Sequence, residues 1–215
     1  MPRTYPISLI LSQRPCLVVG GGSVAERKVL SLLACGAKVK VVSPSLTPTL
    51  QDLASKGKIN YRRGTFEIAD LENMFLVIAA TDRDEVNHRI ATEAMARNML
   101  VNVVDDPPYG NFYVPAVLRR GSLQIAISTD GKSPLLARKI KEELEERYGP
   151  EYGILVDLLG EIRHDILNKI TDPRKRRELL EAIVDDETLQ LLAGGELEKA
   201  KERVINAYHR SRSKP

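Results

Sequence analysis

Short apolar runs alternate with amphipathic stretches over the first hundred residues of the chain. The apolar runs are rich in β-branched residues and lie at 15–19, 38–42, 59–62, 75–80 and 100–104. Between them, residues 23–34, 47–55 and 84–97 place apolar side chains at helical spacing, and Gly36 follows the first of these stretches as a C-cap would. Strands and helices in this alternation predict a parallel sheet that is covered by helices on both faces.

The pattern changes at residues 105–109 (DDPPY), where two prolines interrupt regular structure. Residues 122–128 alternate as a strand does, and residues 133–148 predict a helix with Ser133 as its N-cap. Beyond Pro150 the pattern is helical, at 152–169, 172–184, 186–192 and 196–209. We therefore expect an α/β protein with a Rossmann-like parallel sheet at 1–113, a small α+β segment at 114–148 and a helical domain at 149–215.

Composition narrows the class of protein only slightly. The 215 residues are 43% hydrophobic and carry a formal charge of +3, which gives no reason to expect a nucleic-acid partner. Cys16 and Cys35 lie in a predicted strand and a predicted helix, without a CxxC pairing, as core thiols of a reducing compartment do. No apolar run approaches the roughly 18 residues of a membrane span, and the first residues do not resemble a signal peptide. We expect a soluble, cytoplasmic protein with no membrane association.

The glycine-rich turn after the first strand predicts a dinucleotide site. Gly20, Gly22 and Ala25 fit the pattern G-x-G-x-x-G/A, with a strand before them and a helix after them. The first glycine permits the tight turn, the second lets the backbone approach a pyrophosphate, and the small third residue lets the helix pack on the strand. A structural turn without a ligand is the alternative interpretation.

The acidic residue that usually binds the adenosine ribose after the second strand is absent. Ser43, Pro44 and Ser45 stand there instead, and their hydroxyl and backbone groups could bind the ribose more weakly. No arginine follows directly to bind a 2′-phosphate, which favours NAD over NADP. Thr81 follows the fourth strand, where loops surround the ligand, and it could equally cap the next helix.

Four strings in order resemble one family: GGGSVAERK, AATDRDEVN, VNVVDDP and ISTDGKSPLLAR. They resemble precorrin-2 dehydrogenase, the dehydrogenase and ferrochelatase module of siroheme synthase. The resemblance runs from about Ile7 to Tyr148, with a looser match through the helical tail. Because no methyltransferase domain follows within 215 residues, the chain looks like the stand-alone form.

This resemblance implies an activity and a set of residues. Members of the family transfer a hydride from precorrin-2 to NAD and form sirohydrochlorin, and some then insert ferrous iron. They are homodimers that use the segment after the Rossmann domain, here 114–148, for dimerisation. The family's proposed catalytic aspartate falls on Asp105, and its cofactor contacts fall on the glycine turn, Ser23, Val24 and 43–45. A serine near the tetrapyrrole, phosphorylated in some members, aligns with Thr129, next to Ser128.

Precorrin-2 carries eight carboxylates, so its site should be basic. Candidate residues for these carboxylates, each of which could equally be a solvated surface cation, are Arg119, Arg120, Lys132 and Arg138. Metal ligation is not expected, because His88, His164 and His209 show no ligand spacing and are better explained as surface or structural residues. Iron would then be a substrate and not a resident metal.

Three other functions remain open from the sequence. A regulatory NAD-binding module of the kind that gates potassium uptake also has the glycine turn, but it usually keeps the acidic residue that is missing here. A redox-sensing DNA binder would need a helix-turn-helix, which we do not find. A dehydrogenase with another substrate is opposed by the motifs that follow the Rossmann pattern.

Overall fold

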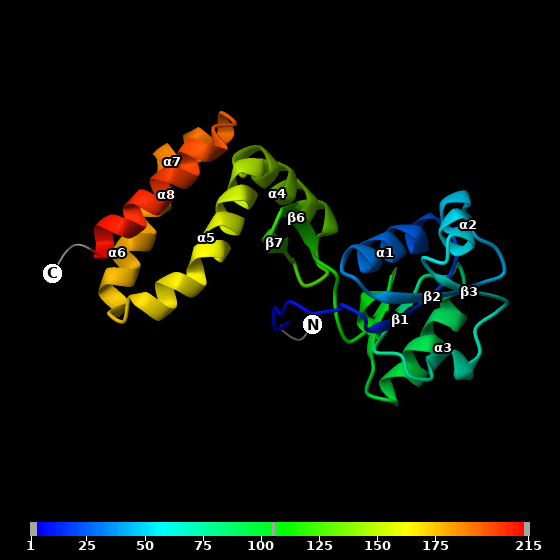
Figure 1. Cartoon of the computed structure of the whole chain (residues 1–215). Helices are drawn as coiled ribbons and strands as arrows, with labels where there is room; N and C mark the ends of the chain where they lie inside the picture. Colours follow the sequence, from blue (N-terminus) through cyan, green and yellow to red (C-terminus); the bar gives the residue numbers. More distant parts are fainter. Residues whose placement is uncertain (1–3, 105, 213–215) are drawn as a thin grey trace. The chain divides into compact units, whose positions relative to one another are not determined.

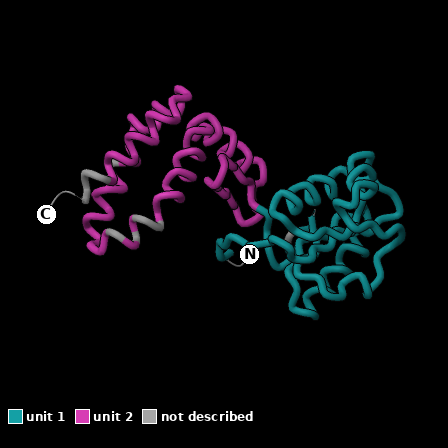
Figure 2. Tube along the Cα trace, in the orientation of Figure 1, with its two compact units in different colours: residues 1–114 teal, residues 115–215 magenta. Residues whose placement is uncertain are grey.

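The computed structural model describes residues 4–104 and 106–212. By their internal contacts, residues 1–114 and 115–215 form two compact units, shown in Figure 2. Figure 1 labels their helices and strands.

The first unit is built on a five-stranded parallel sheet, among the described residues, in the order β3-β2-β1-β4-β5. Its strands are β1 (Pro15–Val19), β2 (Lys38–Ser43), β3 (Asn60–Arg63), β4 (Leu76–Ala79) and β5 (Leu100–Val103). The helices between them are α1 (Ser23–Ala34), α2 (Pro48–Ser55), the 3-10 helix η1 (Ile68–Leu71) and α3 (Asp84–Met95). The strand order reverses between β1 and β4, and ligands of such sheets bind at the crevice outside that point.

Side-chain alternation along the strands explains why both faces of the sheet are covered. Cys16 and Val18 of β1 pack in one cluster with α1 and α2, whereas Leu17 and Val19 pack in a second cluster with α3. Successive strand residues point to opposite faces, so a strand that is apolar throughout needs a helix on each side. The Rossmann-like fold predicted from the sequence is confirmed.

The second unit begins with an antiparallel hairpin of β6 (Ala116–Arg120) and β7 (Leu123–Ile127). The helices α4 (Pro134–Arg147) and α5 (Pro150–Lys169) pack on it. Gly153 permits a close approach of α5, because a Cβ there would lie 2.5 Å from the carbonyl oxygen of Arg120. The remaining helices are α6 (Pro173–Ile183), α7 (Asp186–Ala193) and α8 (Leu197–Arg212).

The helices α5 to α8 share a core of their own. Its buried members include Leu158, Leu179, Ile183, Leu192 and Val204. None of the helices in the described part of the chain is both long and apolar enough to cross a bilayer. The division of the second unit at residue 148, into an α+β segment and a helical domain, stays a prediction.

The sequence pattern did not predict the strand β6. Ala116–Leu118 is only three apolar residues long and two arginines follow it, so no alternation shows. Its strand conformation comes from pairing with β7, where Ala116 lies opposite Ile127, and such pairing is a tertiary effect. The predicted start of α4 is confirmed: Ser133 Oγ accepts a hydrogen bond from the Leu136 N–H at 3.2 Å.

Candidate functional site

A cavity of about 1000 Å³ lies at the carboxyl ends of the strands of the first unit. Its wall is formed by the turn after β1, the loops after β2, β3 and β4, one side of α3, and Val104 after β5. The eight residues predicted to bind the cofactor all line it: Gly20, Gly22, Ser23, Val24, Ser43, Pro44, Ser45 and Thr81. The structure thus brings these residues together at the crevice, and their contact with a dinucleotide stays a prediction.

The glycine turn owes its shape to two close backbone approaches. Gly20 has a φ of +127°, and a Cβ there would lie 2.1 Å from the carbonyl oxygen of Ala80. A Cβ on Gly21 would lie 1.9 Å from the carbonyl oxygen of Ser45. Both positions therefore require glycine for the chain to fold.

Gly22, unlike Gly20 and Gly21, has free space where a side chain would lie. A Cβ there would meet no atom within 4 Å, and Gly22 both lines the cavity and forms the N-cap of α1. A bare backbone at a helix N-terminus, next to open space, fits the approach of a pyrophosphate, because the N–H groups and the helix dipole favour negative charge. The residues present therefore fit a dinucleotide.

The loop after β2 is fastened to the glycine turn. The Thr47 N–H donates to the carbonyl of Gly21 at 3.0 Å, and the Thr47 hydroxyl donates to the carboxylate of Glu26 on α1. Thr47 also caps α2, since its Oγ1 accepts from the Leu50 N–H at 3.3 Å. These bonds hold Ser43–Thr47 as one wall of the cavity.

Thr81 lines the cavity and is fastened to α3 by the side chain of Asn87. Its hydroxyl donates to Asn87 Oδ1 at 2.8 Å, and the Asn87 side-chain amide donates back to the Thr81 carbonyl at 3.0 Å. Asn87 is buried on α3. The alternative that Thr81 caps α3 is wrong, because Arg83 is the N-cap and no side chain caps this helix. Contact of Thr81 with the cofactor stays a prediction.

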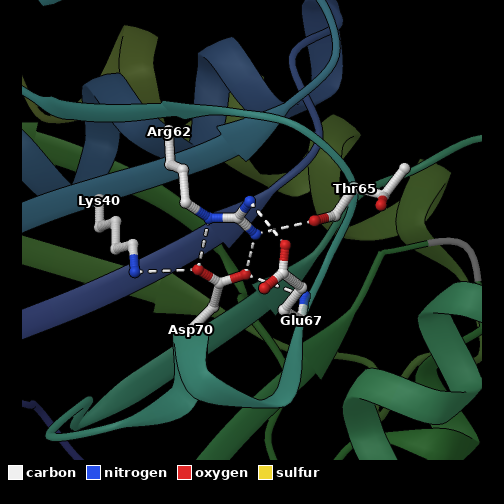
Figure 3. Close-up of polar contacts among 5 residues, drawn as sticks. All are labelled: Lys40, Arg62, Thr65, Glu67 and Asp70. Carbon is white, nitrogen blue, oxygen red and sulfur yellow. Dashed lines mark hydrogen bonds and ion pairs between the residues drawn. The ribbon is translucent and has the colours of Figure 1, made fainter.

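The loop after β3 lines the cavity with Gly64, Thr65 and Phe66, and an ion cluster below it holds it in place (Figure 3). The Arg62 guanidinium donates to both carboxylate oxygens of Asp70 and to the carbonyl of Thr65. Lys40 Nζ lies 2.9 Å from Asp70 Oδ1. Because the Asp70 side chain is only 4% exposed, these partners compensate for its lost hydration.

Burial alone would raise the pKa of Asp70. The hydrogen bonds from Arg62, from the Glu67 N–H and from Lys40 outweigh that effect and lower the pKa to about 2. A carboxylate whose pKa is depressed in the folded state contributes stability above its unfolded pKa of 3.8, and this stability is lost as the pH falls toward 2.

We expect Asp70→Asn to lower the free energy of unfolding at pH 7 by about 2 kcal/mol, because Arg62 and Lys40 lose their anionic partner. The difference from the wild type should shrink as the pH falls below 4, because the Asp70 carboxylate of the unfolded wild-type chain takes up protons there while that of the folded protein stays ionised down to about pH 2. Urea unfolding at pH 7, 5, 4 and 3 measures it. Asp52→Asn is the matched control, since the Asp52 side chain is 54% exposed and pairs only with Lys56 on the same helix. A difference that is the same at every pH would contradict the role of the ionised Asp70.

Several cavity residues were not predicted from the sequence. They are Val19, Gly21, Val42, Leu46, Thr47, Gly64, Thr65, Phe66, Ala80, Asp82, Arg83, Glu85, Val86, Arg89 and Val104. Gly21 stands in the middle of the three glycines, so its signal was visible. Arg89 gave a weaker signal: it lies eight residues beyond Thr81, on the side of α3 that also lines the cavity with Glu85 and Val86.

The residues predicted to bind the substrate lie in the second unit. Arg119 and Arg120 are on β6, Ser128, Thr129 and Lys132 are in the loop before α4, and Arg138 is on α4. The Arg120 guanidinium donates to the carbonyls of Tyr148 and Glu145, at 2.9 and 3.2 Å, and so ties β6 to the end of α4. Arg138 pairs with Glu142 at 2.9 Å. Binding of substrate by all six residues stays a prediction.

The loop before α4 is ordered by its own hydroxyl groups. Ser128 Oγ accepts from the Asp130 N–H at 3.2 Å, and Thr129 Oγ1 accepts from the Ser133 N–H at 3.0 Å. Asp130 and Gly131 both have positive φ values, 51° and 76°. Ser128 and Thr129 thus shape the turn into the helix, which is a structural role that the sequence did not indicate.

Asp105, predicted to be catalytic, lies outside the described residues. Its neighbour Val104 lines the cavity, and Asp106 Oδ2 lies 3.0 Å from Nε2 of His88 on α3. Among the residues that the structure describes, no group of three or more His, Cys, Asp or Glu side chains could hold a metal ion.

Comparisons with known proteins cover almost the whole chain. Residues 7–116 match a family model described as putative NAD(P)-binding. Residues 120–147 match the sirohaem biosynthesis protein central model, and residues 151–207 match the sirohaem synthase dimerisation region.

Individual relatives agree with the family models. The siroheme synthase of Methylobacillus flagellatus is 40% identical over 92% of this chain and 42% of its own length. That of Xylella fastidiosa is 45% identical over 82% of this chain and 37% of its own length. The chain thus spans about two fifths of the curated relatives it matches. The solved structure of SirC, a precorrin-2 dehydrogenase, is similar over 93% of this chain and all of its own, with 34% identity and a TM-score of 0.75. The chain therefore belongs to the siroheme synthase family, and its first unit is the family's nicotinamide-dinucleotide-binding domain.

Proposed function

We propose that this chain catalyses the NAD-dependent dehydrogenation of precorrin-2 to sirohydrochlorin. The observation that carries the proposal is the cavity at the β1–β4 crevice, lined by an open glycine turn, in a chain that matches a precorrin-2 dehydrogenase over that enzyme's full length. The sirohaem synthase dimerisation model over residues 151–207 supports a homodimer. We place the reaction in the cytoplasm.

NAD, when bound, accepts the hydride that leaves a carbon of precorrin-2. The chain's own residues perform the other tasks. Gly20 and Gly22 with the N-terminus of α1 hold the pyrophosphate, and Ser43–Ser45 contact the adenosine ribose. Thr81, locked by Asn87, shapes the wall after β4. Asp105 accepts the proton that must leave with the hydride, since dehydrogenation removes both.

Two basic side chains near the loop after β3 bear on the choice between NAD and NADP. The basic side chains under the loop after β3, Lys40 and Arg62, are both held by the carboxylate of Asp70. A 2′-phosphate at Ser43–Ser45 would need a cation that is free to pair with it. Neither of these two side chains is available for that.

The experiment that tests the proposal is anaerobic. Purified protein is mixed with enzymatically generated precorrin-2 and NAD, and NADH and the tetrapyrrole spectrum are followed together. Appearance of NADH with sirohydrochlorin supports the dehydrogenase. Binding of NAD without formation of NADH would contradict it and favour a regulatory NAD-binding module. Ferrous iron is then added as a second substrate, and insertion faster than in a protein-free control assigns the chelatase activity.

The cavity also supplies a cation for a substrate carboxylate. Arg89 lines it, and among the described residues Arg89 has no carboxylate partner. Arg83 also lines the cavity, but it lies 3.7 Å from Glu85 and is 66% exposed. A guanidinium without a competing carboxylate is the better candidate to bind one from the substrate.

We expect Arg89→Ala to raise KM for precorrin-2 about tenfold, the effect of one lost charge-assisted hydrogen bond, while kcat and the Kd for NAD change less than twofold. Steady-state kinetics and NAD titration measure this. Arg97→Ala is the matched control, since Arg97 pairs with Glu93 at 2.6 Å and does not line the cavity. If Arg89→Ala weakens the binding of NAD as much as that of precorrin-2, Arg89 instead contacts the dinucleotide.

A further inference from the structure

Three side chains form a compact cluster beside the carboxyl end of β5. His88 on α3 places Nε2 3.0 Å from Asp106 Oδ2. Its ring stacks on Tyr109 of the 3-10 helix η2 (Pro107–Tyr109), with ring centroids 3.6 Å apart and planes inclined by 12°. The imidazole is therefore held in its plane by a carboxylate and on its face by a phenol ring. From the sequence, His88 was expected to be a surface or structural residue. The structure shows which two side chains it contacts, Asp106 and Tyr109.

The chemistry of the pair defines the direction of the hydrogen bond. An ionised carboxylate can only accept a hydrogen bond. Nε2 of His88 therefore carries a hydrogen and donates the hydrogen bond to the Asp106 carboxylate. The side chains of His88 and Asp106 are 31% and 40% exposed, so the bond lies at the surface of the unit and not in its core. A contact of this exposure adds little to global stability, and its effect is local.

The segment after β5 has two anchors. At its far end, Asn111 Oδ1 accepts from the Val101 N–H at 2.8 Å, and Asn102 Nδ2 donates to the Phe112 carbonyl at 3.1 Å. At its near end, in the part of the chain that the structure describes, His88 supplies both the hydrogen bond and the ring contact that join α3 to residues 106–109.

Neighbouring residues of α3 serve the two loops at this end of the cavity. Asn87 fastens Thr81 in the loop after β4, and His88 fastens Asp106 in the segment after β5. The same helix turns Val86 and Arg89 into the cavity wall. A single helix thus couples the cavity wall to the two loops that follow the central strands.

We propose that His88 is a positioning residue, which holds the segment after β5 against α3 through Asp106 and Tyr109 and so sets the geometry of catalysis at the start of that segment. The proposal rests on the dehydrogenase function proposed above, with Asp105 as its base. Asp106 directly follows Asp105 in the chain, and a misplacement of about 1 Å at a reacting group can lower a rate about 100-fold.

The test separates the two contacts of His88 in the full-length protein. His88→Phe keeps a ring to stack on Tyr109 but removes the donor to Asp106. His88→Gln keeps a donor but removes the ring. We expect His88→Phe to lower kcat about tenfold, with the Kd for NAD and the melting temperature nearly unchanged. His88→Gln, which keeps the donor to Asp106 but loses the ring contact with Tyr109, should recover part of kcat. Tyr109→Phe, which keeps the stacking surface, should behave as the wild type.

A measurement independent of turnover completes the test. Amide hydrogen exchange at Asp106 and Tyr109 should become faster in His88→Phe, while exchange within α3 stays as in the wild type. A kcat within twofold of the wild type in His88→Phe, or no recovery in His88→Gln, would overturn the proposal. So would unchanged exchange at Asp106 and Tyr109, whether or not the wild-type chain oxidises precorrin-2. If the wild-type protein produces no NADH, only the proposed function is rejected. The exchange experiment still tests whether His88 holds residues 106–109, because it does not depend on turnover.

Discussion

Asp105→Asn should fold, bind NAD and lose most of its dehydrogenase activity, with kcat lowered on the order of 100-fold or more. Removal of a hydride leaves a proton that must go to a base, and an amide of the same size cannot accept it. Val104, the residue before Asp105, lines the cavity and donates its N–H to the Ala79 carbonyl at 3.1 Å. Val104 is the last described residue before position 105, and it follows the carboxyl end of β5, the edge of the sheet at which ligands bind.

Single-turnover formation of NADH under anaerobic conditions measures this loss, because it isolates the chemical step from product release. The Kd for NAD and the melting temperature should stay near the wild-type values, since the change removes neither cavity-lining backbone nor buried side chain that the structure describes. Asp52→Asn, an exposed carboxylate on α2, is the matched control. Turnover close to that of the wild type in Asp105→Asn would remove Asp105 from the mechanism.

The fold of the first unit could be predicted because its signals are local. The strand β1 was expected at 15–19 and α1 at 23–34, and both occupy those residues. The buried parallel strands read as continuous apolar runs, and the helices between them have a clear 3.6-residue period. The strand β6 was missed because its conformation depends on a partner strand and not on its own pattern.

The candidate site was predicted in part, for the same reason. The glycine turn and Ser43–Ser45 stand directly after apolar strands, so the sequence indicates their place at the sheet edge. The contribution of Thr65 to the wall depends on Arg62, which is held by Asp70 eight residues along the chain. That type of support is set by three-dimensional packing, and no spacing rule reveals it.

The stacking of His88 on Tyr109 shows the same limit of pattern reasoning. The two residues are 21 positions apart and belong to different elements, and no spacing rule connects them. No spacing in the sequence predicted a partner for Asp106. Its partner on α3 became visible only when the helix and the loop were placed together.

The glycine turn gives the second large expected effect, because its glycines serve different purposes. Gly21→Ala should destabilise the fold by about 3 kcal/mol, since the new Cβ would lie 1.9 Å from a backbone oxygen that cannot move without the loop after β2. Gly22→Asp should leave the fold intact, because its Cβ meets open space and aspartate is a favourable N-cap for α1. Thermal unfolding without NAD separates these two cases.

Gly22→Asp, which should leave the fold intact, is expected to weaken NAD binding strongly. Gly22→Asp places a negative charge where the pyrophosphate should lie, and we expect the Kd for NAD to rise about 100-fold, because like charges in contact cost several kcal/mol. Gly22→Asn has the same shape without the charge and should raise the Kd by only about tenfold. Calorimetric titration with NAD measures both. If Gly22→Asp binds NAD within threefold of the wild type, the phosphates do not lie at this turn. If Gly22→Asp is stable but binds NAD weakly, Gly22 is required for the ligand to approach the turn. Gly21, by contrast, is required for the fold itself.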